Sequence, residues 1–257
     1  MTADDYDLCR VNPIQFAADK RIAESEAIDL FLYSTKLGLF EMEWHLVCAF
    51  CAHVVKSFRE LNNLHSHFIC SFCGAENDVS MDDYIQVSFT ILPQIRDIAF
   101  RHPETLSIED YYGKYHFSKG VQPLPNGHTF ADVFAMLTKL MTYVPPRESA
   151  SVEVDLAPGM LQAKDLSNSA SLVFFLGQPA KAAPTVAFDL HEDEFRAGEQ
   201  PVPVQKIDLP VAPFHLRVAG ELASGKMLVE FTNLMEDRCP LWVLHYPADF
   251  QASYLKF

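Results

Sequence analysis

The chain has 257 residues, of which 49% are hydrophobic and 21% are charged, a balance typical of a folded globular protein rather than a disordered one. Its formal net charge of −14 argues against nucleic-acid and anionic-membrane partners, because their binding depends on clustered lysine and arginine. No apolar run reaches the roughly 18 residues of a membrane span, and the acidic N-terminus MTADDYDLCR lacks the apolar core of a secretory signal. We therefore expect a soluble, cytoplasmic protein that binds neither nucleic acid nor membranes.

The N-terminal region, residues 1–43, is predicted to form a helical cap. The pair Asn12-Pro13 can serve as N-cap and first turn of a short helix that continues to residue 20. A second helix is predicted from about residue 25 to residue 37, because apolar side chains recur there at helical spacing. Its predicted buried stripe includes Ile28, Phe31 and Leu32.

Residues 44–92 are predicted to form a zinc ribbon. They contain Cys48-Ala-Phe-Cys51 and Cys70-Ser-Phe-Cys73, two CxxC motifs separated by 18 residues. Two such turns at the ends of neighbouring hairpins can direct four thiolates at one centre, which is the tetrahedral ligand set of a structural zinc ion. We expect Cys48, Cys51, Cys70 and Cys73 to be the metal ligands, and strands near 44–48, 53–58, 65–70 and 84–92 to carry them.

Two other interpretations of the four cysteines are weaker. They could be buried thiols without a metal, or redox-active dithiols, although exchange chemistry does not need two motifs at this separation. Four thiolates leave no coordination position for water, so the metal is not expected to be catalytic. The nearby histidines would then be redundant as ligands: His45, His53, His65 and His67.

Residues 93–149 are predicted to be a connector with one amphipathic helix. Apolar residues at spacings of three and four run from Phe130 to Val144, Thr129 can act as N-cap, and Pro145-Pro146 would end the helix. The preceding segment is irregular and rich in aromatic residues between Tyr111 and Phe117. These aromatic side chains could form an interaction surface, or they could pack against the neighbouring domain.

Residues 150–257 are predicted to form an antiparallel β-sandwich, because the hydrophobic period changes to two near residue 151 and turn signals separate the segments. The turn signals include Pro158-Gly159, Ser167-Asn168 and Ser224-Gly225. The predicted strands are 151–156, 160–166, 171–176, 185–190, 204–209, 214–219, 227–232 and 241–246. The whole chain is thus expected to be α+β and mostly β.

No catalytic motif was found in the sequence: it has no nucleophile elbow, no phosphate-binding glycine loop and no dinucleotide fingerprint. The acidic segment from Asp189 to Glu194 could suggest a cation site, but a solvated loop explains it as well. Asp155 and Asp165 could be a carboxylate pair, although nothing in the sequence sets their separation. Cys9, in an N-terminus expected to be mobile, and Cys239, in a turn, are expected to be ordinary thiols. We therefore expect a protein without enzymatic activity of its own.

Several segments around the cysteines resemble a known family. Asn12-Pro-Ile-Gln-Phe-Ala, Glu26-Ala-Ile-Asp-Leu-Phe-Leu-Tyr and Gly38-Leu-Phe-Glu-Met-Glu-Trp precede the first CxxC, and Gln86-Val-Ser-Phe-Thr-Ile and His102-Pro-Glu-Thr-Leu follow the second. This order resembles the uncharacterised N-terminal region of bacterial class III adenylate/guanylate cyclases, best over residues 10–120.

The resemblance implies a regulatory region upstream of a cyclase domain, with that domain in cis or another protein as partner. It also implies a homodimer, because class III cyclases form their active sites at dimer interfaces. The resemblance assigns a role only to the four cysteines, because the chain ends at Phe257 without a cyclase catalytic domain whose residues could be compared. That departure favours a truncated form of a longer protein over a stand-alone relative.

The sequence thus predicts a non-catalytic, zinc-stabilised regulatory or binding module. One alternative is a nucleic-acid-binding zinc ribbon with a winged-helix-like cap, yet residues 44–90 hold only Lys56 and Arg59 against five acidic side chains. A second alternative is a stand-alone protein-interaction module unrelated to cyclic nucleotides. A third is a hydrolase or transferase that uses the sandwich as a scaffold.

Overall fold

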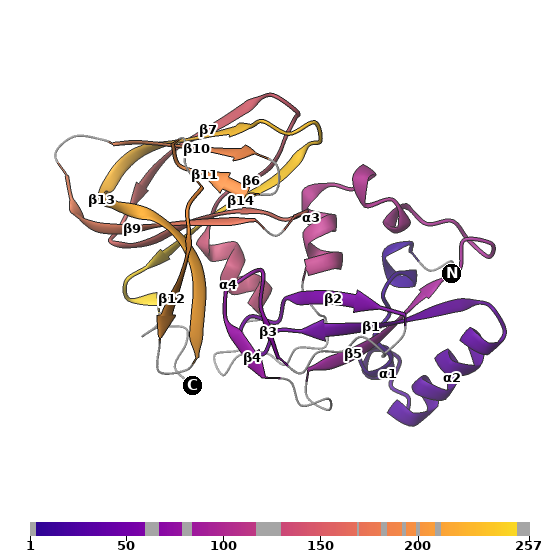
Figure 1. Ribbon diagram of the computed structural model, residues 1–257. Coiled ribbons are helices and arrows are strands. Elements are labelled where there is room, and N and C mark those ends of the chain that lie inside the picture. The colour runs from indigo at the N-terminus through magenta and orange to yellow at the C-terminus, as the bar shows by residue number, and fades with distance from the viewer. Residues whose placement is uncertain are drawn as a thin grey trace. The chain divides into compact units, whose positions relative to one another are not determined.

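The computed structural model describes residues 4–59, 67–78, 84–116, 130–168, 170–180, 184–191, 194–198, 201–208 and 212–250. The chain divides into two compact units, which are described separately (Figure 1). The first comprises Met1–Cys70 and Asn77–Thr129, and the second comprises Ser71–Glu76 and Phe130–Phe257. The predicted fold class is confirmed: the protein is mostly β, with an N-terminal helical region and four cysteines close together. The four-part division of the chain stays a prediction.

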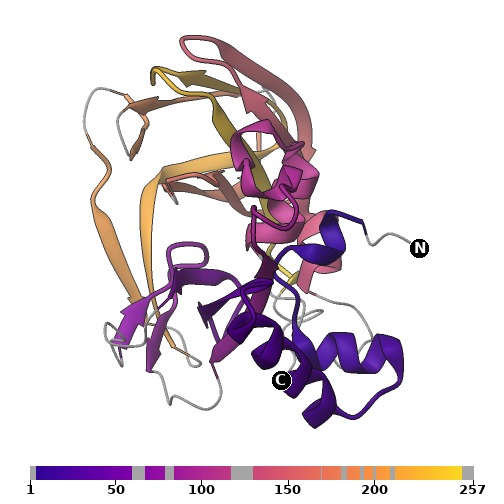
Figure 2. The ribbon, with the colours of Figure 1, turned by 90° about the vertical axis from the view of Figure 1, so that its right-hand side faces the viewer.

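The first unit opens with a 3-10 turn, η1 (Tyr6–Leu8), followed by two helices, α1 (Pro13–Lys20) and α2 (Glu24–Lys36). Both helices were predicted. Asn12 caps α1 as expected, since its side chain accepts hydrogen bonds from the backbone of Ile14 at 2.9 Å and Gln15 at 3.2 Å. The two helices pack against each other and form the cap (Figure 2).

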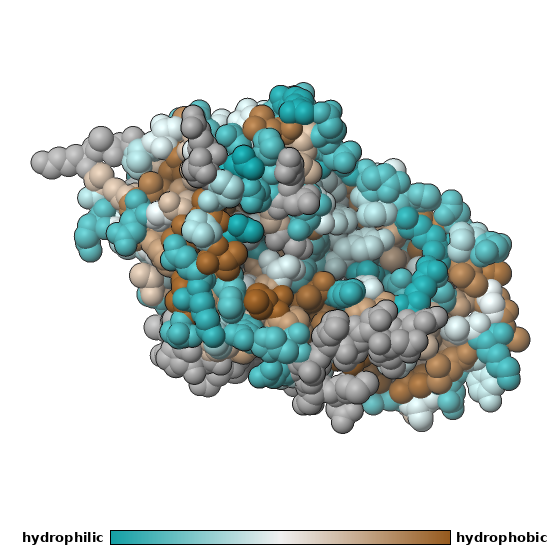
Figure 3. Space-filling view, viewed as in Figure 1, coloured by the Kyte–Doolittle hydropathy of each residue, from teal (hydrophilic) through white to brown (hydrophobic). Residues whose placement is uncertain are grey.

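The predicted buried face of α2 is only partly correct. The helix buries Ala27 and Phe31, and the Phe31 ring stacks on Phe89. Ile28 and Leu32, expected on the same face, are 37% and 45% exposed, because the short helix meets the sheet along a narrower stripe than its apolar residues span. Apolar side chains therefore gather on the surface of the cap (Figure 3), including Ile14, Leu30, Leu32, Tyr33 and Leu37.

The sheet of the first unit consists of β1 (Phe40–Val47), β2 (Val54–Phe58) and β5 (Ile85–Ile91) in the order β2-β1-β5. All of its strand pairs are antiparallel. A short two-stranded sheet pairs β3 (His67–Ile69) with β4 (Glu76–Asp78). Each hairpin carries one CxxC motif in its turn, as expected for a zinc ribbon. The strand after the second motif was misplaced, however: β3 pairs with the short β4, which was not predicted, whereas the predicted strand near 84–92 is β5 and pairs with β1.

The segment after β5 contains two 3-10 turns, η3 (Ala99–Arg101) and η4 (Pro103–Thr105), then α3 (Ile108–Tyr111) and the π-helical turn η5 (Tyr112–His116). Its aromatic residues pack inward: Tyr111 and Tyr115 stack on each other and lie against a buried cluster that includes Cys9. The described aromatics of this segment are thus half-buried rather than forming an open surface, while Phe117 lies outside the described residues.

The second unit shows one clear error of the sequence analysis. The predicted helix from Phe130 to Val144 is helical only as α4 (Phe130–Leu137) and continues as the strand β6 (Thr138–Val144). The segment Thr-Lys-Leu-Met-Thr-Tyr-Val contains three β-branched residues, and its apolar residues fit a period of two as well as a helical one. Antiparallel pairing of β6 with the buried strand β14 (Cys239–Pro247) decides between the two.

Most of the remaining strands lie at predicted positions, but the strand at residues 194–196 was not predicted, and the predicted strands 214–219 and 227–232 are parts of one longer strand. The remaining strands are β7 (Ser149–Leu156), β8 (Gly159–Asp165), β9 (Ser171–Pro179), β10 (Thr185–His191), β11 (Glu194–Arg196), β12 (Val204–Asp208) and β13 (Pro213–Asn233). Together with β6 and β14 they form one mixed sheet, which has nine strands within the part of the chain that the structure describes. A buried core packs between its parts, with side chains from β8, β9 and β14 meeting side chains from β10, β11 and β13.

The purely antiparallel arrangement was wrong for β13, the long bent strand drawn in orange in Figures 1 and 2. β13 pairs in parallel with β9 over Val218–Ser224 and in parallel with β10 over Leu228–Asn233. The predicted turn at Ser224-Gly225 lies inside this strand, where the pairing with β9 ends and that with β7 begins. Gly225 has φ +107°, so glycine permits the bend that carries β13 from one layer to the other.

None of the helices in the described part of the chain combines the length and the apolar composition that a bilayer-spanning helix requires.

Candidate metal centre

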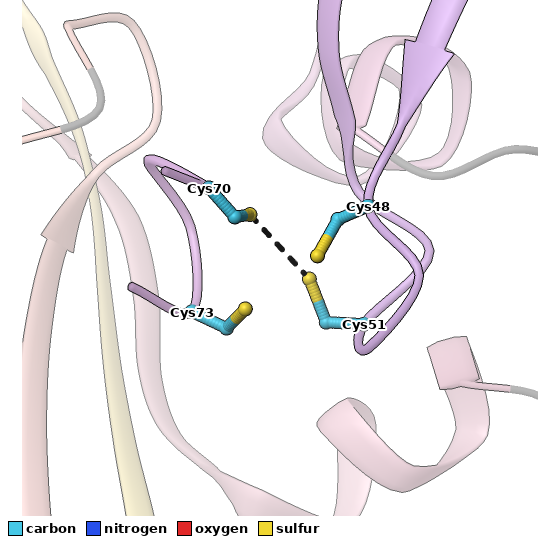
Figure 4. A group of neighbouring side chains, drawn as sticks. All are labelled: Cys48, Cys51, Cys70 and Cys73. Carbon is cyan, nitrogen blue, oxygen red and sulfur yellow. Dashed lines mark hydrogen bonds between the residues drawn. The ribbon is translucent and has the colours of Figure 1, made fainter. Parts of the chain in front are cut away.

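The four predicted ligands lie together. Their Sγ atoms all lie within 4.8 Å of one another. Figure 4 shows the side chains of Cys48, Cys51, Cys70 and Cys73 converging from two turns. In the described ranges this is the one group of three or more potential metal ligands. The Sγ atoms of Cys51 and Cys70 are 3.8 Å apart. Four zinc–sulfur bonds of about 2.3 Å at tetrahedral angles would separate the sulfurs by about 3.8 Å, so the cluster fits this ion.

The first CxxC turn is built by backbone hydrogen bonds. The Cys48 amide donates to the His53 carbonyl at 2.9 Å, and the Ala52 amide donates to the Cys48 carbonyl at 3.0 Å. The Phe50 amide points at the Cys48 sulfur, 3.4 Å away, as expected for a turn that holds a thiolate. Ala52 takes a left-handed conformation with φ +59° to close the turn.

The second CxxC turn has the same shape and needs a glycine at the matching position. Gly74 has φ +81°, and a Cβ there would come within 2.6 Å of the His215 carbonyl oxygen. The Gly74 carbonyl also accepts a hydrogen bond from the His215 amide at 2.7 Å. The left-handed backbone favours glycine here, and the close approach of another strand requires it, since Ala52 occupies the matching position of the first turn.

Asn77 supports the first turn and was missed by the sequence analysis. Its side-chain oxygen accepts from the Ala49 amide at 3.0 Å, and its amide nitrogen lies 3.5 Å from the Cys48 sulfur. The residue is only 4% exposed. Such a partner fixes the orientation of a ligand and donates to its thiolate. Its sequence position gives no sign of this, because the contact depends on how the two hairpins meet.

We expect Asn77→Ala to weaken zinc binding by about 10- to 100-fold, the usual effect of removing a hydrogen-bond partner of a ligand. Competition with a chromophoric chelator would measure the change. Asn12→Ala is the control, since it removes an asparagine whose side chain bonds to the start of α1 and not to the cysteine turns. Equal zinc affinity of Asn77→Ala and the unmodified protein would show that this amide plays no part in binding.

The histidines near the cysteines have other partners. The ring of His45 lies between Ser57 and Ser88, and His53 bonds through Nδ1 to the His116 carbonyl at 2.9 Å. His67 bonds to Asp78 at 2.9 Å, and His65 lies outside the described residues. None of the described histidines belongs to the cysteine cluster.

The two remaining cysteines are buried, which corrects the expectation of a mobile segment for Cys9. Cys9 is 3% exposed and lies in the core cluster of the first unit, because Val11 pairs with Phe89 and draws this part of the chain against the sheet. Burial raises the pKa of its thiol. Cys239 begins β14, and burial together with the nearby Asp165 carboxylate raises its pKa. Both are thus poor nucleophiles at neutral pH.

The other candidate sites do not assemble in the described residues. Asp165 is buried and organises the turn after β8, where it accepts from the backbone and hydroxyl of Ser167 at 2.9 and 2.6 Å. Asp155 is exposed on β7. In the acidic segment, Glu194 pairs with Arg196 at 3.0 Å, while residues 192 and 193 lie outside the described residues.

A family model of unknown function, DUF5939, matches residues 1–216 of the chain, a span that includes both CxxC turns. The chain belongs to this family. Comparisons with curated proteins and with solved structures give no match.

Proposed function

We propose that this member of DUF5939 is a non-catalytic, zinc-stabilised regulatory and binding module that acts on a class III nucleotide cyclase domain. The observation that carries the proposal is the four-cysteine cluster, in which three of the four side chains are fully buried. A zinc ion held by four thiolates has no open position for a water molecule or a substrate. Its role is then to fix the positions of the two turns that hold it.

The surface of the helical cap supports the binding part of the proposal. Leu30, Tyr33 and Leu37 follow one another at helical spacing along α2 and are 49%, 65% and 74% exposed. Contiguous apolar side chains on the surface of a soluble domain are typical of protein-interaction sites. A module of this kind can regulate a cyclase by favouring one arrangement of two catalytic domains over another, which is a population shift.

The link to cyclases rests on the sequence resemblance, and fusion experiments test it. The isolated chain should form no cyclic AMP or cyclic GMP from nucleoside triphosphates with Mg²⁺ or Mn²⁺. A class III cyclase domain fused behind the chain should differ in activity or dimerisation from the domain alone, and Cys70→Ser should alter that difference, whereas Cys239→Ser should not.

Three experimental results would contradict this function. Cyclic nucleotide formation by the isolated chain would overturn the non-catalytic interpretation. A fused cyclase domain with unchanged activity and dimerisation would favour an interaction module unrelated to cyclic nucleotides. Tight, salt-sensitive binding of a random DNA duplex, measured by fluorescence anisotropy, would favour the nucleic-acid-binding alternative instead.

A further inference from the structure

The second CxxC turn is anchored in the core of the second unit by an aromatic side chain. Phe72, the third residue of Cys70-Ser-Phe-Cys73, is 3% exposed. Its ring meets Phe134 of α4 edge-on at 5.1 Å and Trp242 of β14 at 5.3 Å, measured between ring centroids. Trp242 is itself fixed, since its indole nitrogen donates to the Thr138 hydroxyl at 2.8 Å. The turn is therefore part of a packed aromatic cluster.

A buried lysine contacts the same turn. Lys164 of β8 is only 2% exposed, a rare state for a lysine because removing an ammonium group from water is costly. Its Nζ lies 4.2 Å from the centroid of the Phe72 ring and 3.5 Å from the Ser71 carbonyl oxygen, to which it donates. Ser71 and Phe72 are the two residues between Cys70 and Cys73. The ammonium group is thus directed at the turn that holds two of the four sulfurs.

The contact between Lys164 and this turn matters because the zinc-loaded cluster is negatively charged. Zinc with four thiolates carries a formal charge of −2, which is unfavourable in a buried site unless donors or cations lie near it. A cation beside the turn lowers the electrostatic cost of gathering this negative charge, and the Phe72 ring and Ser71 carbonyl keep the cation in place.

We propose that Lys164 is a positioning residue of the metal centre, which holds the Cys70–Cys73 turn in its ligating shape and offsets the negative charge of the zinc-loaded cluster. This inference rests on the proposed zinc site. It implies that the surroundings of the Trp242 ring change when the turn gains or loses the metal ion.

The test compares Lys164→Met and Lys164→Arg with the unmodified protein. Zinc transfer to excess chelator should be about 10- to 100-fold faster for Lys164→Met, while Lys164→Arg should stay within a few-fold of the unmodified protein because it keeps the cation. Gln162→Met is the matched control: Gln162 is two residues away on β8, equally buried, and bonds to Ser171 and Tyr246 rather than to the turn. It should release zinc at the unmodified rate.

A second measurement needs no variant of Lys164. The chain has two tryptophans, so Trp44→Phe leaves Trp242 as the only indole fluorophore. Zinc removal should shift its emission, and zinc addition should restore it. Absence of a shift, or equal zinc release by Lys164→Met and Gln162→Met, would overturn the inference while leaving the zinc site intact. An unmodified protein that binds neither zinc nor Co²⁺ would instead overturn the zinc site itself.

Discussion

Freshly purified, reduced protein should contain close to one zinc ion per chain, and Cys70→Ser should contain almost none after passage over a mild chelating resin. Cys70 is 1% exposed and its sulfur lies 3.8 Å from that of Cys51, so a serine oxygen there would be a poor and badly placed ligand. Because structural zinc contributes folding free energy directly, we expect a loss of about 3 kcal/mol or more. For a domain of this size that corresponds to a midpoint lower by roughly 6–12 °C.

Elemental analysis and thermal unfolding by circular dichroism measure the two effects. Cys239→Ser is the matched control, because Cys239 is also 1% exposed but lies outside the cluster. It should keep its zinc. Four thiolates can also hold iron, so a visible absorption spectrum accompanies the metal analysis. Iron in place of zinc would change the identity of the ion but not the ligand set, whereas reduced protein with no metal would contradict the site.

Local signals in the sequence were sufficient for much of this structure. Asn12 and Pro13 define the start of α1 by hydrogen bonding that involves only neighbouring residues. The spacing within each CxxC motif determines the shape of its turn, so two motifs were enough to predict the cluster. Alternation of apolar residues located most strands after residue 148, since each strand has one face in the core.

Features that depend on distant partners were missed. The segment Thr138–Val144 suits a helix or a strand, and its pairing with β14 decides the outcome. Alternation shows that a strand exists but not which strand it pairs with, so the parallel neighbours of β13 were not predicted. Asn77 and Lys164 lie outside any motif, and their contacts depend on which hairpin or sheet lies against the CxxC turns.

His45 should make the stability of the protein fall as the pH is lowered from neutrality. It is 5% exposed in β1, and its ring nitrogens bond to the hydroxyl groups of Ser57 at 2.8 Å and Ser88 at 2.6 Å. Burial, with a smaller contribution from the nearby Arg10 guanidinium, lowers its pKa from 6.5 to about 3. Arg10 is itself paired with the Glu43 carboxylate, 3.9 Å away.

The sign of this pH effect follows from whether the folded or the unfolded state binds the proton on His45. Between pH 6.5 and about 3 the unfolded chain protonates this histidine while the folded protein does not, so acid favours unfolding. The stabilisation is fully present above pH 6.5 and is lost progressively as the pH falls toward 3. From pH 7 to pH 5 the expected loss due to His45 is about 2 kcal/mol.

Urea unfolding at pH 7, 6 and 5 measures this contribution when the unmodified protein is compared with His45→Gln. Glutamine can still donate to and accept from the two serine hydroxyl groups but does not titrate in this range. Other acid-sensitive groups, the zinc thiolates included, are common to both proteins and cancel in the difference. His45→Gln should therefore lose about 2 kcal/mol less than the unmodified protein between pH 7 and pH 5. His102→Gln, which changes a histidine whose side chain is 52% exposed, controls for the replacement of a histidine outside the core. Parallel stability curves for His45→Gln and the unmodified protein would mean that the buried ring accepts a proton as readily in the folded state as in the unfolded chain.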